Sequence, residues 1–165
     1  MFDTPEGVME FWIRCDLFLA SDFSYGDRFG FGYQNQNHTA DDYNYIATLW
    51  NGAYSSSGRV YTAGYTGYDV GCFIYGDTTW STSKFKTNLF FDKGANNHIL
   101  FHAVSHPTEG YLEVTINHGT YRAENRNVND GNPFTNFFVY SKNDHALFSN
   151  FIVSNTQIPY EDGGN

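Results

Sequence analysis

Tyrosine and tryptophan residues gather in the middle of the chain, beside turn-forming Gly, Asn, Ser and Asp residues. An aromatic ring can stack on the C–H face of a sugar, while amide and carboxylate groups beside it form paired hydrogen bonds with sugar hydroxyls. This combination favours carbohydrate recognition, and a histidine on a later segment is a further candidate for ligand contact. The predicted ligand-binding residues are Trp50, Asn51, Tyr54, Tyr65, Tyr68, Asp69, Trp80 and His102.

Each aromatic residue in this set also has a structural explanation. Tyrosine is common on half-exposed strands, and tryptophan packs well in cores. The ligand hypothesis therefore depends on the whole set of rings that flank turns rather than on any single ring. Trp12 and Arg14 add to it, because both lie on the polar side of the first predicted strand.

Carboxylate pairs that could cleave a glycosidic bond are not evident. A retaining glycosidase needs two carboxyl groups about 5–5.5 Å apart, which on one strand favours acidic residues at positions i and i+2. None of the Glu residues has an acidic residue two positions away. Two distant strands could still bring Glu113 beside another acid. A glycoside hydrolase or polysaccharide lyase therefore stays open as an alternative to a non-catalytic binding module.

The histidines and cysteines give weaker signals. His98, His102 and His106 recur every four residues, but the sequence between them is typical of a strand. Their side chains would then share one face and span about 13 Å, too far for a single metal ion. Cys15 and Cys72 fall at apolar positions of their strands and are expected to be small buried residues, with a disulfide between them as the alternative.

Calcium is the one cofactor that the loops suggest. Calcium prefers several oxygen ligands from carboxylates, amides and backbone carbonyls. The pair Asp41 and Asp42 is the preferred site, with Asp22 and Asp27 and the Asn-rich loop 127–132 as alternatives. The same residue types are also the ordinary residues of turns.

The elements that must position these groups are short strands. Hydrophobic residues alternate with polar ones along 9–19, and turn residues interrupt the chain at regular intervals. A period of two with such interruptions is typical of an all-β sandwich or barrel. The predicted strands cover 9–19, 27–33, 43–50, 59–65, 70–75, 85–91, 98–104, 111–117, 134–140 and 146–153.

Composition narrows the range of partners. The chain of 165 residues is expected to form a single domain over 1–165, because this length suits one hydrophobic core. Its formal net charge is −9, with only 9 Lys and Arg, which argues against nucleic acid or an anionic membrane as partner. The sequence contains no apolar run long enough to predict membrane insertion. The first ten residues lack the features of a signal peptide. Phe residues, 16 in number, are expected to build the core.

The second half of the chain resembles a known family. A strand at 98–104 precedes the hairpin GlyTyrLeuGluValThrIleAsnHisGly at 110–119, and AlaLeuPheSerAsnPheIleValSerAsn at 146–155 closes the chain. This order is similar to laminin G-like and concanavalin A-like jelly-roll domains. The sequence departs from the pattern at Asn117–His118, where an acidic residue before the glycine is commoner. The acidic motif of jelly-roll glucanases is absent.

The resemblance implies a two-sheet antiparallel jelly-roll β-sandwich of concanavalin A-like type. Its last strand would pair beside the first, at 10–19. It also implies loops that often hold calcium. We expect a non-catalytic, lectin-like recognition or adhesion module of a larger extracellular, cell-surface or phage-tail protein, with a glycan or a cell-surface protein as partner. A purely structural protein–protein interaction domain is a further alternative, which an exposed apolar patch would favour.

Overall fold

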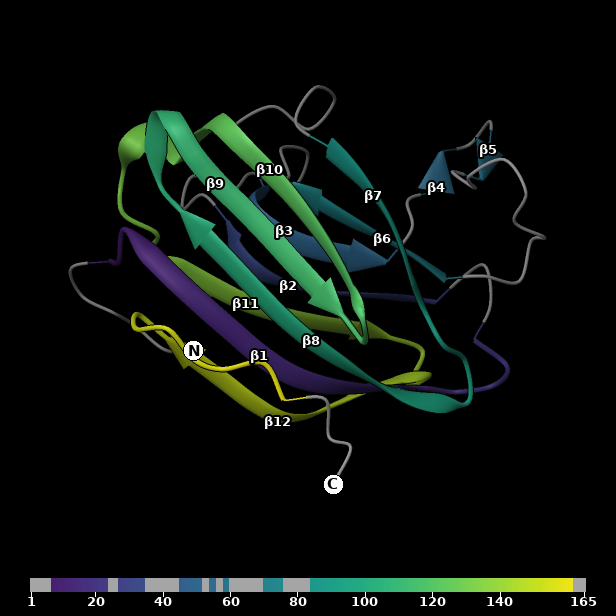
Figure 1. Ribbon diagram of the computed structural model, residues 1–165. Helices are drawn as coiled ribbons and strands as arrows, with labels where there is room; N and C mark the ends of the chain where they lie inside the picture. The colour runs from purple at the N-terminus through teal and green to yellow at the C-terminus, as the bar shows by residue number, and fades with distance from the viewer. Residues whose placement is uncertain are drawn as a thin grey trace.

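The computed structural model describes residues 7–23, 27–34, 45–51, 54–55, 58–59, 70–75 and 84–161. These residues form two five-stranded antiparallel sheets that pack face to face (Figure 1). The β1 sheet has the order β10-β9-β8-β1-β12, and the β2 sheet has the order β11-β2-β3-β6-β7. The all-β, two-sheet jelly-roll sandwich expected from the sequence is confirmed. In the described part of the chain, no helix is long and apolar enough to cross a membrane.

The strands are β1 (Glu10–Leu19), β2 (Arg28–Gln34), β3 (Tyr45–Asn51), β4 (Tyr54–Ser55), β5 (Gly58–Arg59), β6 (Val70–Tyr75), β7 (Lys84–Phe91), β8 (Ala95–Val104), β9 (His106–Ile116), β10 (Gly119–Val128), β11 (Asn136–Lys142) and β12 (Ala146–Ser154). A 3-10 turn, η1 (Asn129–Gly131), follows β10. The short strands β4 and β5 pair only with each other.

Strand β1 shows why the sandwich forms. Its alternate residues from Phe11 to Leu19 are fully buried between the sheets, while the residues between them face outward. Successive side chains on a strand point to opposite faces, so one strand supplies both core and surface. β1 pairs with β8 on one side and with β12 on the other. The expected pairing of the last strand beside the first is therefore confirmed.

Aromatic rings fill the core, as the composition suggested. Phe11, Phe29, Phe31, Phe101 and Phe134 are each fully buried. Many of their contacts are edge-to-face, such as that between Phe11 and Phe101 with ring centroids 5.7 Å apart. Edge-to-face packing places the positive ring edge against the negative face of its neighbour. Phenylalanine thus takes the place of aliphatic residues in this core.

The cysteines belong to the same core. Cys15 and Cys72 are buried free thiols, so the disulfide alternative is wrong. Burial, the main cause, raises the pKa of each thiol. Both residues act as the small buried side chains that their strand positions predicted.

One predicted strand is described only in part, and one observed strand was not predicted. The prediction at 59–65 meets a strand only at Gly58–Arg59, because 60–69 lies outside the described residues. Strand β10 was not predicted. It is an edge strand with a left-handed residue at Asn125 and two register shifts in its pairing with β9, so it has no regular alternation.

A buried carboxylate ties the start of β2 to the β11–β12 turn. Asp27 is 2% exposed, and its oxygens lie 2.8 Å from Asn143 Nδ2 and 2.7 Å from His145 Nδ1. The hydrogen bond to Asp27 raises the pKa of His145, and burial opposes this only in part. The Asp27 carboxylate therefore favours the protonated form of His145.

Replacing Phe31 by Ala should lower the free energy of unfolding by about 3–5 kcal/mol, because the change leaves a cavity between the sheets. Phe18 is 38% exposed on the outward face of β1 and provides the control. Phe18→Ala should cost less than about 1 kcal/mol. Urea unfolding followed by circular dichroism measures both. Equal losses would contradict the assignment of Phe31 to the core.

The stability should fall as pH rises through the titration of His145. Its folded-state pKa lies above the ordinary value of 6.5, so its contribution is complete below that value and is lost as pH rises through the folded-state pKa. The urea midpoint of the wild-type chain should therefore decrease as the pH rises above 6.5. His145→Gln should remove that part of the decrease. An unchanged pH dependence in the variant would show that the Asp27 contact is not the cause.

Candidate functional site

The predicted ligand-binding residues divide between the two sheets. Trp50 lies on the outward face of β3 in the β2 sheet, whereas His102 lies on the outward face of β8 in the β1 sheet. The structure does not bring these two side chains together. The backbone of Tyr54 lies in β4. The remaining predicted ligand and metal residues, Tyr65, Tyr68, Asp69, Trp80, Asp41 and Asp42, lie outside the described residues.

Trp50 is the centre of an aromatic platform, which we define as Trp50, Phe138 and Tyr140 on the outward face of the β2 sheet. Gly30 of β2 is paired with Trp50 on one side and with Tyr140 on the other. The Trp50 ring centroid lies 5.6 Å from that of Tyr140 and 5.7 Å from that of Phe138. Trp50 is half-buried, and Tyr140 is 42% exposed.

Gly30 allows the Trp50 ring to lie close against the sheet. A Cβ atom on Gly30 would lie 2.5 Å from Trp50 Cδ2 and 2.6 Å from Cε3, closer than real Cβ contacts. Gly32, two residues on, has φ +134°, and a Cβ there would lie 2.2 Å from the carbonyl oxygen of Ala47. The missing side chain of Gly30 leaves the space into which the Trp50 ring extends, whereas Gly32 allows the close approach of the β3 backbone.

Asn51, predicted to contact ligand, has a structural role in the fold. It is 4% exposed, its Oδ1 accepts a hydrogen bond from the Phe29 N–H at 3.0 Å, and its Nδ2 donates to the Asp27 carbonyl at 3.1 Å. The residue therefore joins β3 to β2 at the side of the sheet where Asp27 is buried. These contacts account for an amide side chain at this position.

His102 belongs to a packed polar cluster on the opposite sheet. Its Nε2 lies 2.8 Å from Glu10 Oε1, and its ring stacks on Trp12 with centroids 4.3 Å apart and an interplanar angle of 9°. Tyr111 donates a hydrogen bond to Glu113 at 2.6 Å, and Arg122 donates to the same carboxylate. Burial, followed by the hydrogen bond to Glu113, raises the pKa of Tyr111.

This cluster bears on the enzyme alternative. His102, Tyr111 and Arg122 supply residue types that a polysaccharide lyase could use. A general base, however, works best with a pKa near the operating pH. Glu113 is paired with Tyr111 and Arg122 rather than with a second acid, and burial raises the pKa of Tyr111 away from that range. The geometry does not favour acid–base catalysis by this cluster.

A hollow of about 410 Å³ opens between β1 and β12 on the outward face of the β1 sheet. The pairing shifts there, from Arg14 opposite Ile152 to Asp16 opposite Ser149, and Asn150 takes a left-handed φ of 51°. This bulge disrupts the pairing of the two strands locally. The lining residues are Arg14, Cys15, Asp16, Asn150, Phe151, Ile152 and Glu161.

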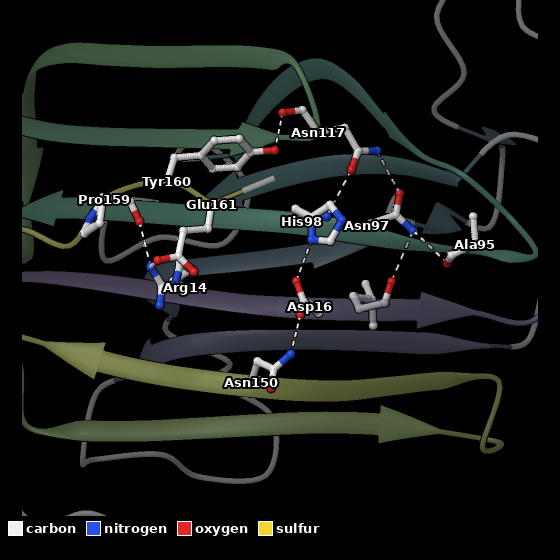
Figure 2. A network of polar contacts seen from close by, with 11 residues as sticks. Arg14, Asp16, Ala95, Asn97, His98, Asn117, Asn150, Pro159, Tyr160 and Glu161 are labelled. Atoms are coloured by element: carbon white, nitrogen blue, oxygen red, sulfur yellow. Dashed lines mark hydrogen bonds and ion pairs between the residues drawn. The ribbon is translucent and has the colours of Figure 1, made fainter. Parts of the chain in front are cut away.

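Asp16 and Arg14 place two charged groups at the hollow (Figure 2). Asp16 lies 2.6 Å from His98 Nδ1 through Oδ1 and accepts a 2.6 Å hydrogen bond from Asn150 through Oδ2. Burial acts to raise the pKa of Asp16, but the hydrogen bonds from Asn150 and His98 outweigh it and the pKa is lowered. Arg14 Nη1 donates to the Pro159 carbonyl and lies 3.0 Å from Glu161 Oε1.

The alternative calcium sites do not form ion cages. Asp27 is occupied by Asn143 and His145, as described above. In the loop after β10, Asn127 Nδ2 and Asp130 bond each other, and Asn129 donates to the carbonyls of Asn132 and Pro133. Within the described ranges, no group of three His, Cys, Asp or Glu residues could hold a metal ion. The preferred pair, Asp41 and Asp42, is outside those ranges.

Comparison with known proteins supports the class of fold. The chain is similar in structure to CG-16, a homodimeric agglutinin from chicken liver, with a TM-score of 0.51 and 13% sequence identity. The match covers 90% of this chain and 94% of the agglutinin. No protein-family model and no curated protein sequence matches the chain. The chain therefore has the concanavalin A-like jelly-roll fold, and the specific likeness to laminin G domains stays a prediction.

Gly30→Ala should lower the free energy of unfolding by about 1–3 kcal/mol, because the new methyl group meets the Trp50 ring. The same change made in a Trp50→Ala background should cost less, by at least about 0.5 kcal/mol, since the ring is gone. Urea unfolding of the four proteins in this cycle measures the coupling. Strictly additive losses would mean that Gly30 does not position the Trp50 ring.

Proposed function

We propose that this chain is a non-catalytic carbohydrate-recognition module, and that its ligand stacks on the aromatic platform of Trp50, Phe138 and Tyr140. The observation that carries the proposal is the position of the Trp50 ring over Gly30, at the outward surface of the β2 sheet. A ring held against a sheet by glycine can present its face to the C–H groups of a sugar at little entropic cost, because its rotamer is already fixed.

Three further observations support this proposal. Tyr140 is 42% exposed beside Trp50, so the platform reaches solvent. The predicted ligand residues from Tyr54 to Trp80 follow β3 in the sequence, so they come soon after Trp50 along the chain. The fold is also similar to that of a protein described as an agglutinin. Together these favour the β2 sheet over the β1 sheet for the sugar.

The module is proposed to act outside the cell, on a cell surface or on a virion, with a glycan as partner. Its acidic and lysine-poor composition suits an exposed recognition module better than a nucleic-acid-binding one. Structural calcium at Asp41 and Asp42 remains part of the proposal. It rests on the residue types, because paired carboxylates in a loop are suitable ligands for this ion.

A glycan array probed with the purified chain tests the function. We expect binding to a restricted set of glycans. Trp50→Ala should weaken it at least about tenfold, because the variant removes the central stacking surface. Trp12→Ala removes a tryptophan from the opposite sheet and is the matched control, with little effect expected. Repeating the array with chelator reveals whether binding needs calcium.

If the chain binds no glycan on a broad array, carbohydrate recognition is contradicted. If binding is lost in the Trp12 variant and kept in the Trp50 variant, the sugar binds to the β1 sheet. That result would contradict the proposed site on the β2 sheet. Circular dichroism of both variants separates a lost contact from a lost fold.

A further inference from the structure

The hollow between β1 and β12 lies on the sheet opposite the aromatic platform. Its volume of about 410 Å³ is within the range of about 300–1,000 Å³ typical of small-molecule sites. Its walls combine a guanidinium, a carboxylate, an amide and the apolar side chain of Ile152, which is 38% exposed. This mixture is suited to a ligand that carries an acid group, hydroxyls and C–H surface.

Part of the chain itself borders the hollow. After β12, residues 155–161, which we call the strap, turn back over the face of the β1 sheet (Figure 1). Figure 2 shows the strap held by Arg14, through the Pro159 carbonyl and the Glu161 carboxylate, and by a hydrogen bond from Tyr160 to the Asn117 carbonyl. Glu161 thus places a carboxylate on Arg14 at the edge of the hollow.

The strap is weakly attached. It is not part of a strand, and five of its seven residues are exposed. The side chain of Glu161 is 66% exposed, whereas that of Arg14 is 19% exposed. Segments with few buried contacts open at low free-energy cost. A ligand carboxylate could therefore replace Glu161 on Arg14 without unfolding the sheet.

The donors and acceptors around Arg14 suit a sugar acid. The contacts to the strap use only Nη1 of a guanidinium that carries five N–H donors. Asp16 is held ionised by His98 and Asn150, and a carboxylate has capacity to accept further bonds from ligand hydroxyls. Asn150 uses its Nδ2 on Asp16, and its amide oxygen is a hydrogen-bond acceptor. Since the chain has a net charge of −9, recognition of an anion must come from Arg14 locally.

We propose that this hollow is a second ligand site, specific for a carboxylate-bearing sugar of the uronate class, and that Glu161 of the strap competes for its carboxylate position. The ligand carboxylate pairs with Arg14, its hydroxyls bond Asp16 and Asn150, and its C–H face contacts Ile152. The site is separate from the aromatic platform, so each can be tested without the other.

The test compares glucuronate with glucose, which have the same ring with and without the acid group. Both are titrated into the isotope-labelled full chain while amide resonances are followed. Glucuronate should shift the amides around Arg14, Asn150 and Ile152 with millimolar affinity, and glucose should not. Glu161→Gln should tighten glucuronate binding about two- to fivefold, the effect expected for loss of an exposed competing ion pair. Arg14→Gln should weaken it more than about tenfold.

Two control variants carry the same charge changes elsewhere on the β1 sheet. Glu109→Gln lies at an exposed position beside His106, and Arg122→Gln removes the partner of Glu113. Both should leave glucuronate affinity within about twofold of wild type. Trp50→Ala should also leave it unchanged, which separates this site from the proposed glycan platform.

Equal responses to glucuronate and glucose would overturn the proposal, as would an unchanged affinity in Glu161→Gln. The Glu161→Gln measurement can be made even if Arg14→Gln fails to fold. Glu161 is exposed at the end of the described chain, so its replacement is not expected to prevent folding. A thermal unfolding curve for each variant identifies such a failure.

Discussion

Burial of alternate side chains between two sheets is the constraint on which the rest of this structure depends. β1 places Phe11, Ile13 and Leu17 in the core, and this choice of face fixes the outward direction of Trp12, Arg14 and Asp16. A shift of one residue would exchange core and surface completely. Both the packed polar cluster around His102 and the hollow at Arg14 are therefore consequences of the same alternation, because their residues lie on the face that β1 cannot bury.

The two outward faces differ in how they use aromatic rings. On the β1 sheet, Trp12 stacks on His102 and the polar groups satisfy one another. On the β2 sheet, Gly30 carries no side chain, so that Trp50 can extend over the neighbouring strand. The first arrangement stabilises a surface, whereas the second supplies a preorganised apolar surface beside the exposed ring of Tyr140.

The sequence predicted the strands with regular alternation and the pairing of the last strand beside the first. It did not predict β10, whose bulges and exposed edge remove the period of two. It marked Asn117 only as a departure from a familiar pattern. The structure explains that residue: its Oδ1 accepts the His98 N–H, and its Nδ2 donates to Asn97 Oδ1, a pair of roles that a carboxylate could not fill.

The candidate site was less accessible to sequence reasoning. Trp50 was identified from its neighbours, but its partners Tyr140 and Gly30 lie far away in the chain and meet it only through strand register. Asn51 was predicted to contact a sugar because it carries an amide. An amide serves equally well in buried hydrogen bonds to the backbone, which is the role that Asn51 has in the fold. Arg14 was predicted to lie on the polar face of its strand. The hollow beside it depends on a bulge in β12, and the sequence analysis did not predict that bulge.

The most direct measurement of the central claim is the response of the Trp50 indole resonance to a neutral glycan that the chain binds. The account predicts a saturable shift of that resonance together with those of Gly30 and Tyr140, and no shift around Trp12 and His102. A response confined to the β1 sheet, with the Trp50 indole unchanged at saturating glycan, would contradict it.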